Sequence, residues 1–266
     1  MDAVEKDIFT MRTRFIHTLG LTLLLGFGCV PFLRAAEKVG VASSALTNAA
    51  ALAGQELAAT RQRLSAAATN SVAAWQLGRA CFTWGKLLTS HTEQEKIYTE
   101  GVTACRRSIA LDPKSAPGHY YLGMNIGRVA DLKRNLAAFS MVKEVEQSFQ
   151  RARELDEQFA HAGPDRNLGL LYQHAPGWPL SVGDKKLGRK HLARAVELAG
   201  DYPENRLNLA EAALEWKDPK LVQNELAALE KLWPSAKTNL VGPEWEFDWQ
   251  DWEVRRADLQ RKLAPK

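Results

Sequence analysis

Two short patterns alternate four times between residues 70 and 242, and this repetition constrains the fold more than any other feature of the chain. A Leu followed by a small residue opens each copy, at Leu77-Gly78, Leu122-Gly123, Leu168-Gly169 and Leu209-Ala210. A Leu-containing ending closes each copy, at Ser108–Pro113, Ala152–Glu157, Ala195–Gly200 and Leu229–Pro234. The alternation predicts helical hairpins. A single hairpin cannot bury its apolar face alone, so consecutive hairpins must stack.

The small residues have a physical role in this prediction. At Gly78, Gly123 and Gly169 the absence of a side chain lets two paired helices approach closely, and large residues on the partner helix fill the space. Pro and Gly residues and the Leu-containing endings of the repeats set the expected helix boundaries. Helices are predicted near residues 71–88, 92–111, 116–139, 141–157, 164–174, 184–199, 203–216 and 218–232, with Pro234 as the stop of the last one.

The pattern resembles the tetratricopeptide repeat, whose helix-turn-helix unit is about 34 residues long. Pro234 follows Gly200 by 34 residues, and the two earlier units are longer, at 44 and 43 residues. The resemblance implies an all-α fold, a tetratricopeptide-like superhelix of about four helical hairpins with an inner surface for recognition.

The segments flanking residues 70–242 are predicted to be single helices. Residues 37–69 are rich in Ala and form an N-terminal helix. Residues 243–266 place Trp245, Trp249 and Trp252 at helical spacing. This stripe is interpreted as a capping helix, because a stack of repeats needs its last apolar face covered. An exposed aromatic patch for a partner is the alternative.

Residues 1–36 have the three parts of a secretory signal peptide: a basic start after Met11, an apolar run over residues 19–33, and small residues at Ala35-Ala36. We expect export to the periplasm or secretion after cleavage there. The apolar run is shorter than the ~20 residues of a membrane span, which disfavours a retained anchor. Lipid attachment at Cys29 is a further, less favoured alternative. Acidic residues before Met11 suggest that Met11 is the biological start.

The sequence offers no pattern for catalysis or for nucleic-acid binding. The net charge is +4, and basic residues alternate with acidic ones instead of forming a block. The six histidines form no zinc-binding pair, and the chain lacks a nucleophile elbow, a phosphate loop and a dinucleotide fingerprint. We therefore expect no catalytic residues, no metal, no cofactor and no enzyme activity.

Cys81 and Cys105 occupy facing positions of the first predicted hairpin. One interpretation is a disulfide, which an oxidising compartment permits when the two Cα atoms lie within about 7 Å. The other is a pair of small, buried apolar side chains.

The segment from His174 to Asp184 is predicted to be a loop, because it holds two prolines and two glycines, and Asp184 suits the N-cap of the next helix. Together with its neighbours Gly169–Tyr172 and Leu192–Leu198, it resembles the T component of TRAP transporters, over about residues 140–235. That resemblance implies a periplasmic homo-oligomer, such as a trimer, that docks a substrate-binding protein and passes a small hydrophobic ligand.

The phase of the repeat places a set of side chains on the inner surface. By resemblance to the family, the predicted partner- or ligand-binding groove consists of Arg79, Tyr120, Met124, Arg128, Arg166, Leu170, Gln173, His174, Leu207 and Glu211. Apolar groups in this set can be buried against a partner while Arg side chains grip carboxylates. The sequence thus predicts an exported binding or scaffold protein with a protein partner. The alternative is a carrier of a small amphipathic ligand.

Overall fold

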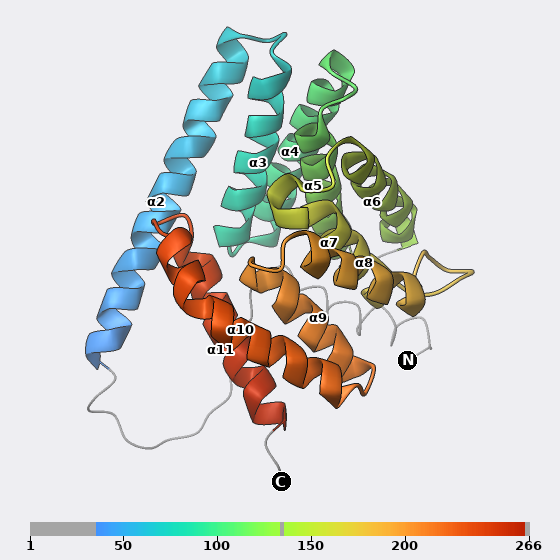
Figure 1. Ribbon diagram of the computed structural model, residues 1–266. Helices are drawn as coiled ribbons and strands as arrows, with labels where there is room; N and C mark the ends of the chain where they lie inside the picture. The colour runs from blue at the N-terminus through green and yellow to red at the C-terminus, as the bar shows by residue number, and fades with distance from the viewer. Residues whose placement is uncertain (1–35, 134–135, 264–266) are drawn as a thin grey trace.

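The computed structural model describes residues 36–133 and 136–263, and these residues form an all-α array (Figure 1). The ten helices of the described residues are α2 (Ala36–Ala66), α3 (Ser71–Leu87), α4 (His91–Leu111), α5 (Ala116–Lys133), α6 (Leu136–Leu155), α7 (Phe159–His174), α8 (Lys185–Leu198), α9 (Pro203–Glu215), α10 (Pro219–Asn239) and α11 (Glu246–Leu263). The predicted fold class is confirmed. The predicted signal peptide and Cys29 lie outside the described residues.

Consecutive helices pair into four antiparallel hairpins: α3 with α4, α5 with α6, α7 with α8, and α9 with α10. Several helices begin directly after a residue whose side chain caps the first turn. Asn70, Ser90, Asp184 and Asp218 each accept a hydrogen bond from a backbone N–H of the following first turn. The predicted cap at Asp184 is confirmed, since its carboxylate accepts from the backbone N–H of Lys186 at 2.8 Å.

Several predicted boundaries are wrong. The helices predicted over 116–139 and 141–157 span Ala116–Lys133 and Leu136–Leu155, and the helix predicted to begin at residue 164 begins at Phe159. Pro234 was expected to end its helix, but α10 continues past it to Asn239. The residues on either side explain the extension: Trp233 and Ala236 are both buried, and the Trp233 ring meets the Trp249 ring of α11 at 5.3 Å. Burial of this face outweighs the loss of one hydrogen bond inside the helix.

The predicted close approach at three glycines is confirmed. A Cβ atom added at Gly78 would collide with the sulfur of Cys105, one at Gly123 would lie 2.8 Å from Phe149, and one at Gly169 would lie 2.6 Å from Leu192. Each partner lies on the second helix of the same hairpin. The Leu-small pattern therefore sets the packing distance inside these three hairpins.

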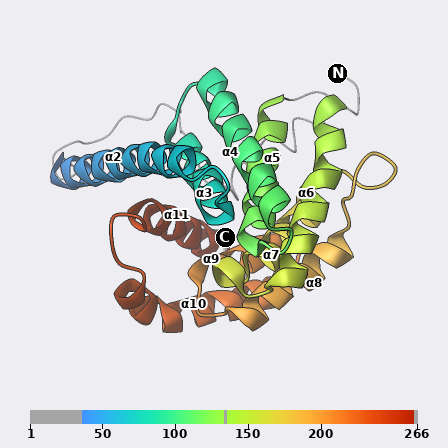
Figure 2. The same cartoon turned by 90° about the horizontal axis from the view of Figure 1, so that it is seen from above.

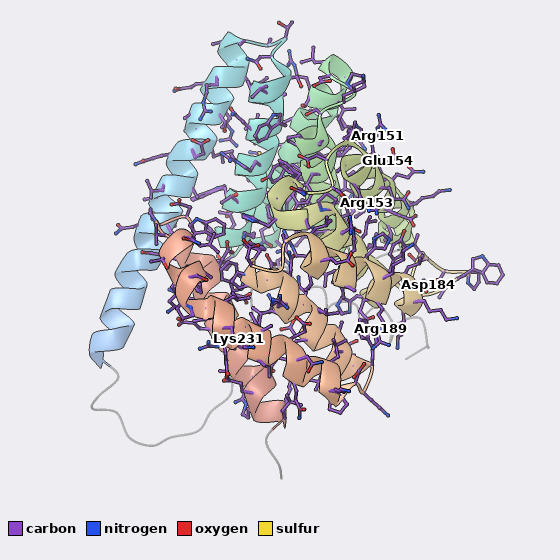
Figure 3. All side chains as sticks on the ribbon, in the orientation of Figure 1. Arg151, Arg153, Glu154, Asp184, Arg189 and Lys231 are labelled. Atoms are coloured by element: carbon purple, nitrogen blue, oxygen red, sulfur yellow. The ribbon has the colours of Figure 1, made fainter. Side chains whose placement is uncertain are left out.

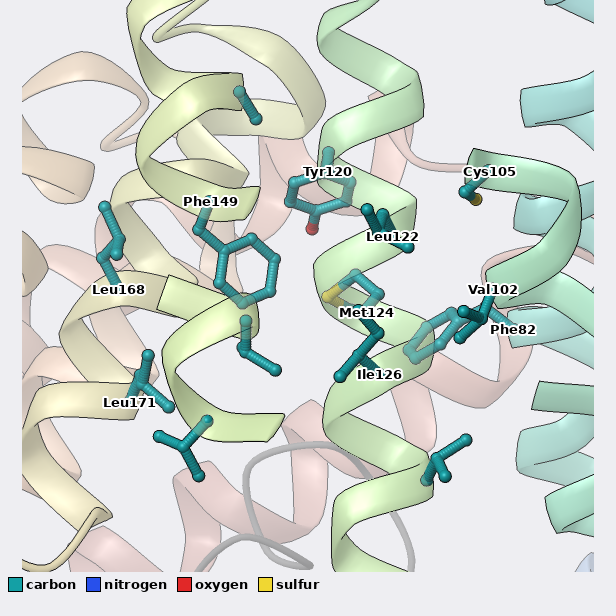
Figure 4. Close-up of a cluster of buried hydrophobic side chains, with 14 of the residues drawn as sticks. Phe82, Val102, Cys105, Tyr120, Leu122, Met124, Ile126, Phe149, Leu168 and Leu171 are labelled. Atoms are coloured by element: carbon teal, nitrogen blue, oxygen red, sulfur yellow. The ribbon is translucent and has the colours of Figure 1, made fainter. Parts of the chain in front are cut away.

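Buried side chains form a core that runs along the stack. The largest cluster joins the first three hairpins and includes Phe82, Ile126, Phe149 and Leu171 (Figure 4). A second cluster joins α9, α10 and α11 around Leu207 and Trp252. A third cluster packs the first hairpin against α2 around Leu57 and Leu77, so every cluster draws on more than one hairpin or on a flanking helix.

The array curls until its two ends meet. The last helix, α11, packs against α9 and α10 and also touches α2 at the start of the array (Figure 2). The ammonium group of Lys86 on α3 lies 3.8 Å from the Asp248 carboxylate of α11 and 5.2 Å from the centre of the Phe247 ring. The last helix therefore closes the array against its first helices.

Candidate functional site

A row of aromatic side chains crosses the first helices of the hairpins. The rings of Trp75 on α3 and Tyr121 on α5 are stacked, with centroids 6.2 Å apart and planes 3° apart. The Tyr121 ring then meets Phe159, at the start of α7, edge to face at 6.2 Å. All three side chains are partly exposed. We call Trp75, Tyr121 and Phe159, together with His161, the aromatic row.

His161 carries the row to the last part of the array. Its imidazole is stacked on the Tyr202 ring at 4.3 Å and 9°, and it meets Trp245 edge to face at 6.3 Å. His161 is exposed, whereas Tyr202 is buried. One face of the imidazole is covered by the Tyr202 ring, and this partial burial together with the nearby Arg166 charge lowers the pKa of His161. The ring is therefore an uncharged stacking surface at neutral pH.

The backbone that positions His161 has an unusual conformation. Ala160, His161 and Ala162 all have left-handed dihedral angles, with φ of 52°, 56° and 58°. Each L-residue in this conformation costs about 1–2 kcal/mol. Strain of this size persists only where surrounding contacts hold it, and it is often found at functional sites.

Arg166 and Asn205 hold this left-handed turn. The Arg166 guanidinium donates to the carbonyl oxygens of His161 at 3.0 Å and Ala160 at 3.3 Å, and to Asn205 Oδ1 at 2.9 Å. Asn205 in turn donates from Nδ2 to the His161 oxygen at 3.0 Å. Arg166 also lies over the Tyr202 ring. The turn is thus fixed by buried polar groups from α7 and α9.

One exposed guanidinium accompanies the aromatic row. Arg79 lies 5.8 Å from the centre of the Trp75 ring, and its side chain is 45% exposed. Its nearest carboxylate is Glu56 of α2, at 3.6 Å and also largely exposed. An exposed pair at this distance contributes little to stability. Arg79 can therefore exchange Glu56 for a carboxylate of a partner at small cost.

Most residues of the predicted groove lie in the interior, between hairpins. Tyr120, Met124, Leu170 and Leu207 belong to the buried clusters. Gln173 is buried, donates to Glu215 on α9 and accepts from the Trp216 indole. The structure thus places these five side chains in contacts between units, and a ligand-binding role for them stays a prediction.

Three of the remaining members of the predicted groove are charged side chains with partners inside the array. Arg166 is buried, and it serves the left-handed turn. Arg128 is mostly buried against the Tyr98 ring and lies 3.8 Å from Asp131. Glu211 accepts from Arg255 of α11 at 2.8 Å, and His174 is partly buried at the end of α7. Of the three predicted arginines, Arg79 alone is exposed in the described structure.

Sequence reasoning missed Tyr121, Phe159 and His161. Tyr121 directly follows Tyr120, and the repeat phase alone does not say which of two adjacent tyrosines faces outward. Phe159 and His161 lie at a left-handed turn, which no pattern of apolar residues predicts. Arg79 and Tyr120, the neighbour of Tyr121, are the members of the predicted groove that lie beside this surface.

Cys81 and Cys105 are free thiols in the structure, and both are buried. The disulfide considered from the sequence is not formed here, and the alternative of two small buried side chains describes what is seen. Burial raises the pKa of the Cys81 thiol to about 12 and also raises that of Cys105. Neither thiol is suited to act as a nucleophile at neutral pH.

One buried polar cluster has catalytic residue types but serves as a tie between helices. Asp165 of α7 is fully buried and accepts from Arg153 of α6 at 2.9 Å and from His191 of α8 at 2.7 Å. The nearest ring to His191 is that of Tyr172, at 5.4 Å. Three helices thereby share one buried carboxylate. Nowhere in the described ranges do three or more metal-ligating side chains gather.

The predicted loop between α7 and α8 is confirmed as non-helical and projects from the array (Figure 1). Its backbone is held by hydrogen bonds from Gly183 to the Pro176 oxygen at 2.8 Å and from Asp184 to the Tyr172 oxygen at 2.9 Å.

None of the helices in the described part of the chain is long and apolar enough to cross a bilayer.

Comparisons with known proteins support the repeat fold. A family model described as regulator of microtubule dynamics protein 1-3 matches residues 45–162. Among solved structures, the protein TTC0263 from Thermus thermophilus, described as a thermophilic TPR protein, is 17% identical with a TM-score of 0.57, over 81% of this chain and 99% of its own.

A second structure, yeast Tom70, is 11% identical with a TM-score of 0.29, over 96% of this chain and 70% of its own. No match was found among curated proteins. The chain has a tetratricopeptide-like helical-repeat fold.

Proposed function

We propose that this chain is an exported scaffold of the bacterial envelope that binds an extended, apolar and acidic segment of a protein partner along the aromatic row. The observation that carries the proposal is the continuous line of partly exposed rings from Trp75 through Tyr121 to Phe159, with exposed Arg79 beside it. Aromatic rings and Arg dominate the binding energy of protein interfaces. Export is expected from residues 1–36 alone.

The strained turn supports the same surface. Three consecutive left-handed residues raise His161 to the end of the row, and buried Arg166 and Asn205 hold them there. A stack of hairpins does not itself require such a turn. Preorganised rings lose little side-chain entropy when a partner binds.

The test is affinity capture from the native envelope fraction with the chain and its variants. Trp75→Ala and Arg79→Ala should each weaken capture of the partner by about tenfold or more. The matched control is Arg106→Ala, because Arg106 is 59% exposed on α4 of the same hairpin and pairs only with Glu144 in the described structure. Capture that is unchanged in both variants would refute a binding role for the aromatic row.

A narrower proposal is that the partner is a periplasmic substrate-binding protein, as the resemblance of residues 140–235 to the T component of TRAP transporters implies. The same capture experiment addresses it, since the captured protein is identified by its mass. The carrier alternative would instead be supported by a small amphipathic ligand that copurifies with the chain and is lost in Trp75→Ala.

A further inference from the structure

The loop between α7 and α8 exposes apolar side chains that the repeat fold does not need. Trp178 is 90% exposed and Leu180 is 50% exposed, the first being the most exposed large apolar side chain in the described residues. The other seven tryptophans are partly or fully buried. A bare indole at the tip of a loop loses favourable burial energy unless a partner covers it.

The loop presents these side chains on a fixed backbone. Leu180 and Ser181 donate to the Gly177 oxygen at 3.1 and 3.3 Å, and Gly177 pairs with Gly183 across the loop. A Cβ atom added at Gly183 would collide with the backbone oxygens of Ala175 and Pro176, so this close approach requires Gly. Val182 packs against the main core cluster. Trp178 therefore points outward from a loop whose backbone is hydrogen-bonded and whose Val182 packs on the core.

Three lysines follow the loop at the start of α8. Lys185, Lys186 and Lys190 are exposed, and none makes an ion pair with another described residue. At 3.6 residues per turn Lys186 and Lys190 point away from buried Gly188 and Leu192, whereas Lys185 is exposed as the first residue of the helix. The Asp184 carboxylate caps this helix by accepting from the backbone N–H groups of Lys186 and Leu187, and no lysine ammonium pairs with it. The three ammonium groups are thus left to the solvent.

We propose that the loop 175–184 and the lysines of the first turns of α8 dock on an anionic lipid bilayer. Trp residues prefer the interface between headgroups and acyl chains, where the indole ring is buried and its N–H stays hydrated. Each Lys near a negatively charged leaflet adds attraction. The charge complementarity between Lys185, Lys186 and Lys190 and anionic headgroups selects this occupant.

A protein partner fits this surface less well. Protein interfaces are depleted in Lys and enriched in Arg, and their aromatic anchors lie at the centre of a broad patch. Here the free charges are all Lys, and the one Arg of the cluster, Arg189, is paired with Asp218 at 2.6 Å. The apolar part is a narrow tip instead of a patch. Both features favour insertion into a lipid surface.

The test uses the full chain and vesicles of phosphatidylcholine with phosphatidylglycerol, in which the phosphatidylcholine carries brominated acyl chains. Bromine should quench the Trp178 emission, and the extra quenching should disappear in Trp178→Phe. This difference is specific to the loop, because membrane binding by any other segment affects both proteins equally. The substitution changes an almost fully exposed side chain, so folding is unaffected.

Charge variants complete the design. Lys185→Glu with Lys186→Glu should weaken partition into the anionic vesicles by at least about fivefold per lysine, and pure phosphatidylcholine should bind weakly. Lys231→Glu is the matched control, since Lys231 is exposed on α10, away from Asp184 and Arg189 (Figure 3). Equal quenching of the chain and Trp178→Phe would overturn the proposal, as would a protein contact that needs Trp178 without any lipid binding.

Discussion

Replacement of Arg166 by Ala tests whether a buried guanidinium maintains the left-handed turn. The side chain is buried and makes two short hydrogen bonds, to the His161 oxygen at 3.0 Å and to Asn205 Oδ1 at 2.9 Å. A hydrogen bond to a charged group contributes about 1.5–3 kcal/mol, and removing one partner of a buried set leaves the others unsatisfied. We expect the free energy of unfolding to fall by about 3–5 kcal/mol.

The strain of the turn supports a loss of this size. Three left-handed residues cost roughly 3–6 kcal/mol together, and the contacts of Arg166 offset that cost. Without them, residues 160–162 should relax and the His161 ring should leave the Tyr202 ring. Arg166→Lys should be almost as destabilising as Arg166→Ala, since an ammonium group cannot donate to two carbonyl oxygens and an amide in the forked geometry.

The assay is urea unfolding followed by far-UV circular dichroism, with the slope m compared between variants. Arg194→Ala is the control, because the pairs of Arg194 with Glu157 and Glu197 lie at the surface, where ion pairs contribute little to stability. A loss below about 1 kcal/mol in Arg166→Ala would refute the idea that this arginine holds the turn.

Three further predictions follow from packing, titration and burial. Gly78→Ala should destabilise the fold by about 1–3 kcal/mol because its Cβ meets the Cys105 sulfur, whereas Gly127→Ala, with no atom within 4 Å, should be neutral or stabilising by up to about 1 kcal/mol in thermal unfolding. Burial raises the pKa of the Asp131 carboxyl from 3.8 to about 7, so the folded state holds its proton more tightly and stability should fall as pH rises from about 4 to 7. Asp131→Asn should flatten this slope in urea unfolding; a slope unchanged by the substitution would contradict the assignment. Cys81 and Cys105 should resist maleimide in the native chain and react fully in denaturant without reductant, as read by peptide mass; protection in denaturant would show a disulfide.

Sequence alone accounted for the elements that depend on local pattern. The Leu-small pairs located the first helix of each hairpin, and the glycines at 78, 123 and 169 predicted the close contacts seen with Cys105, Phe149 and Leu192. Asp184 was predicted to cap the following helix, and it caps α8 in the structure. These features follow from helix periodicity and from the size of single side chains, both of which are visible in a linear sequence.

The predicted groove shows where that reasoning stops. The repeat phase predicted which face of each first helix lines the inner surface, but it could not give the distance across that surface. Arg166, Leu170 and Gln173 lie on the expected helix and are nevertheless buried. Their burial depends on how tightly the hairpins curl, which is the sum of small rotations between units.

Three features were decided by tertiary structure. The closure of α11 onto α2 and α3 depends on contacts between residues far apart in the chain, such as Lys86 with Asp248. The left-handed turn at 160–162 exists because groups from α7 and α9 hold it. The outward position of Trp178 depends on a loop tied to the core. Local pattern determines which segments are helices and which faces are apolar, whereas only the assembled stack determines which of those side chains remain exposed, because exposure is a property of all neighbouring segments together.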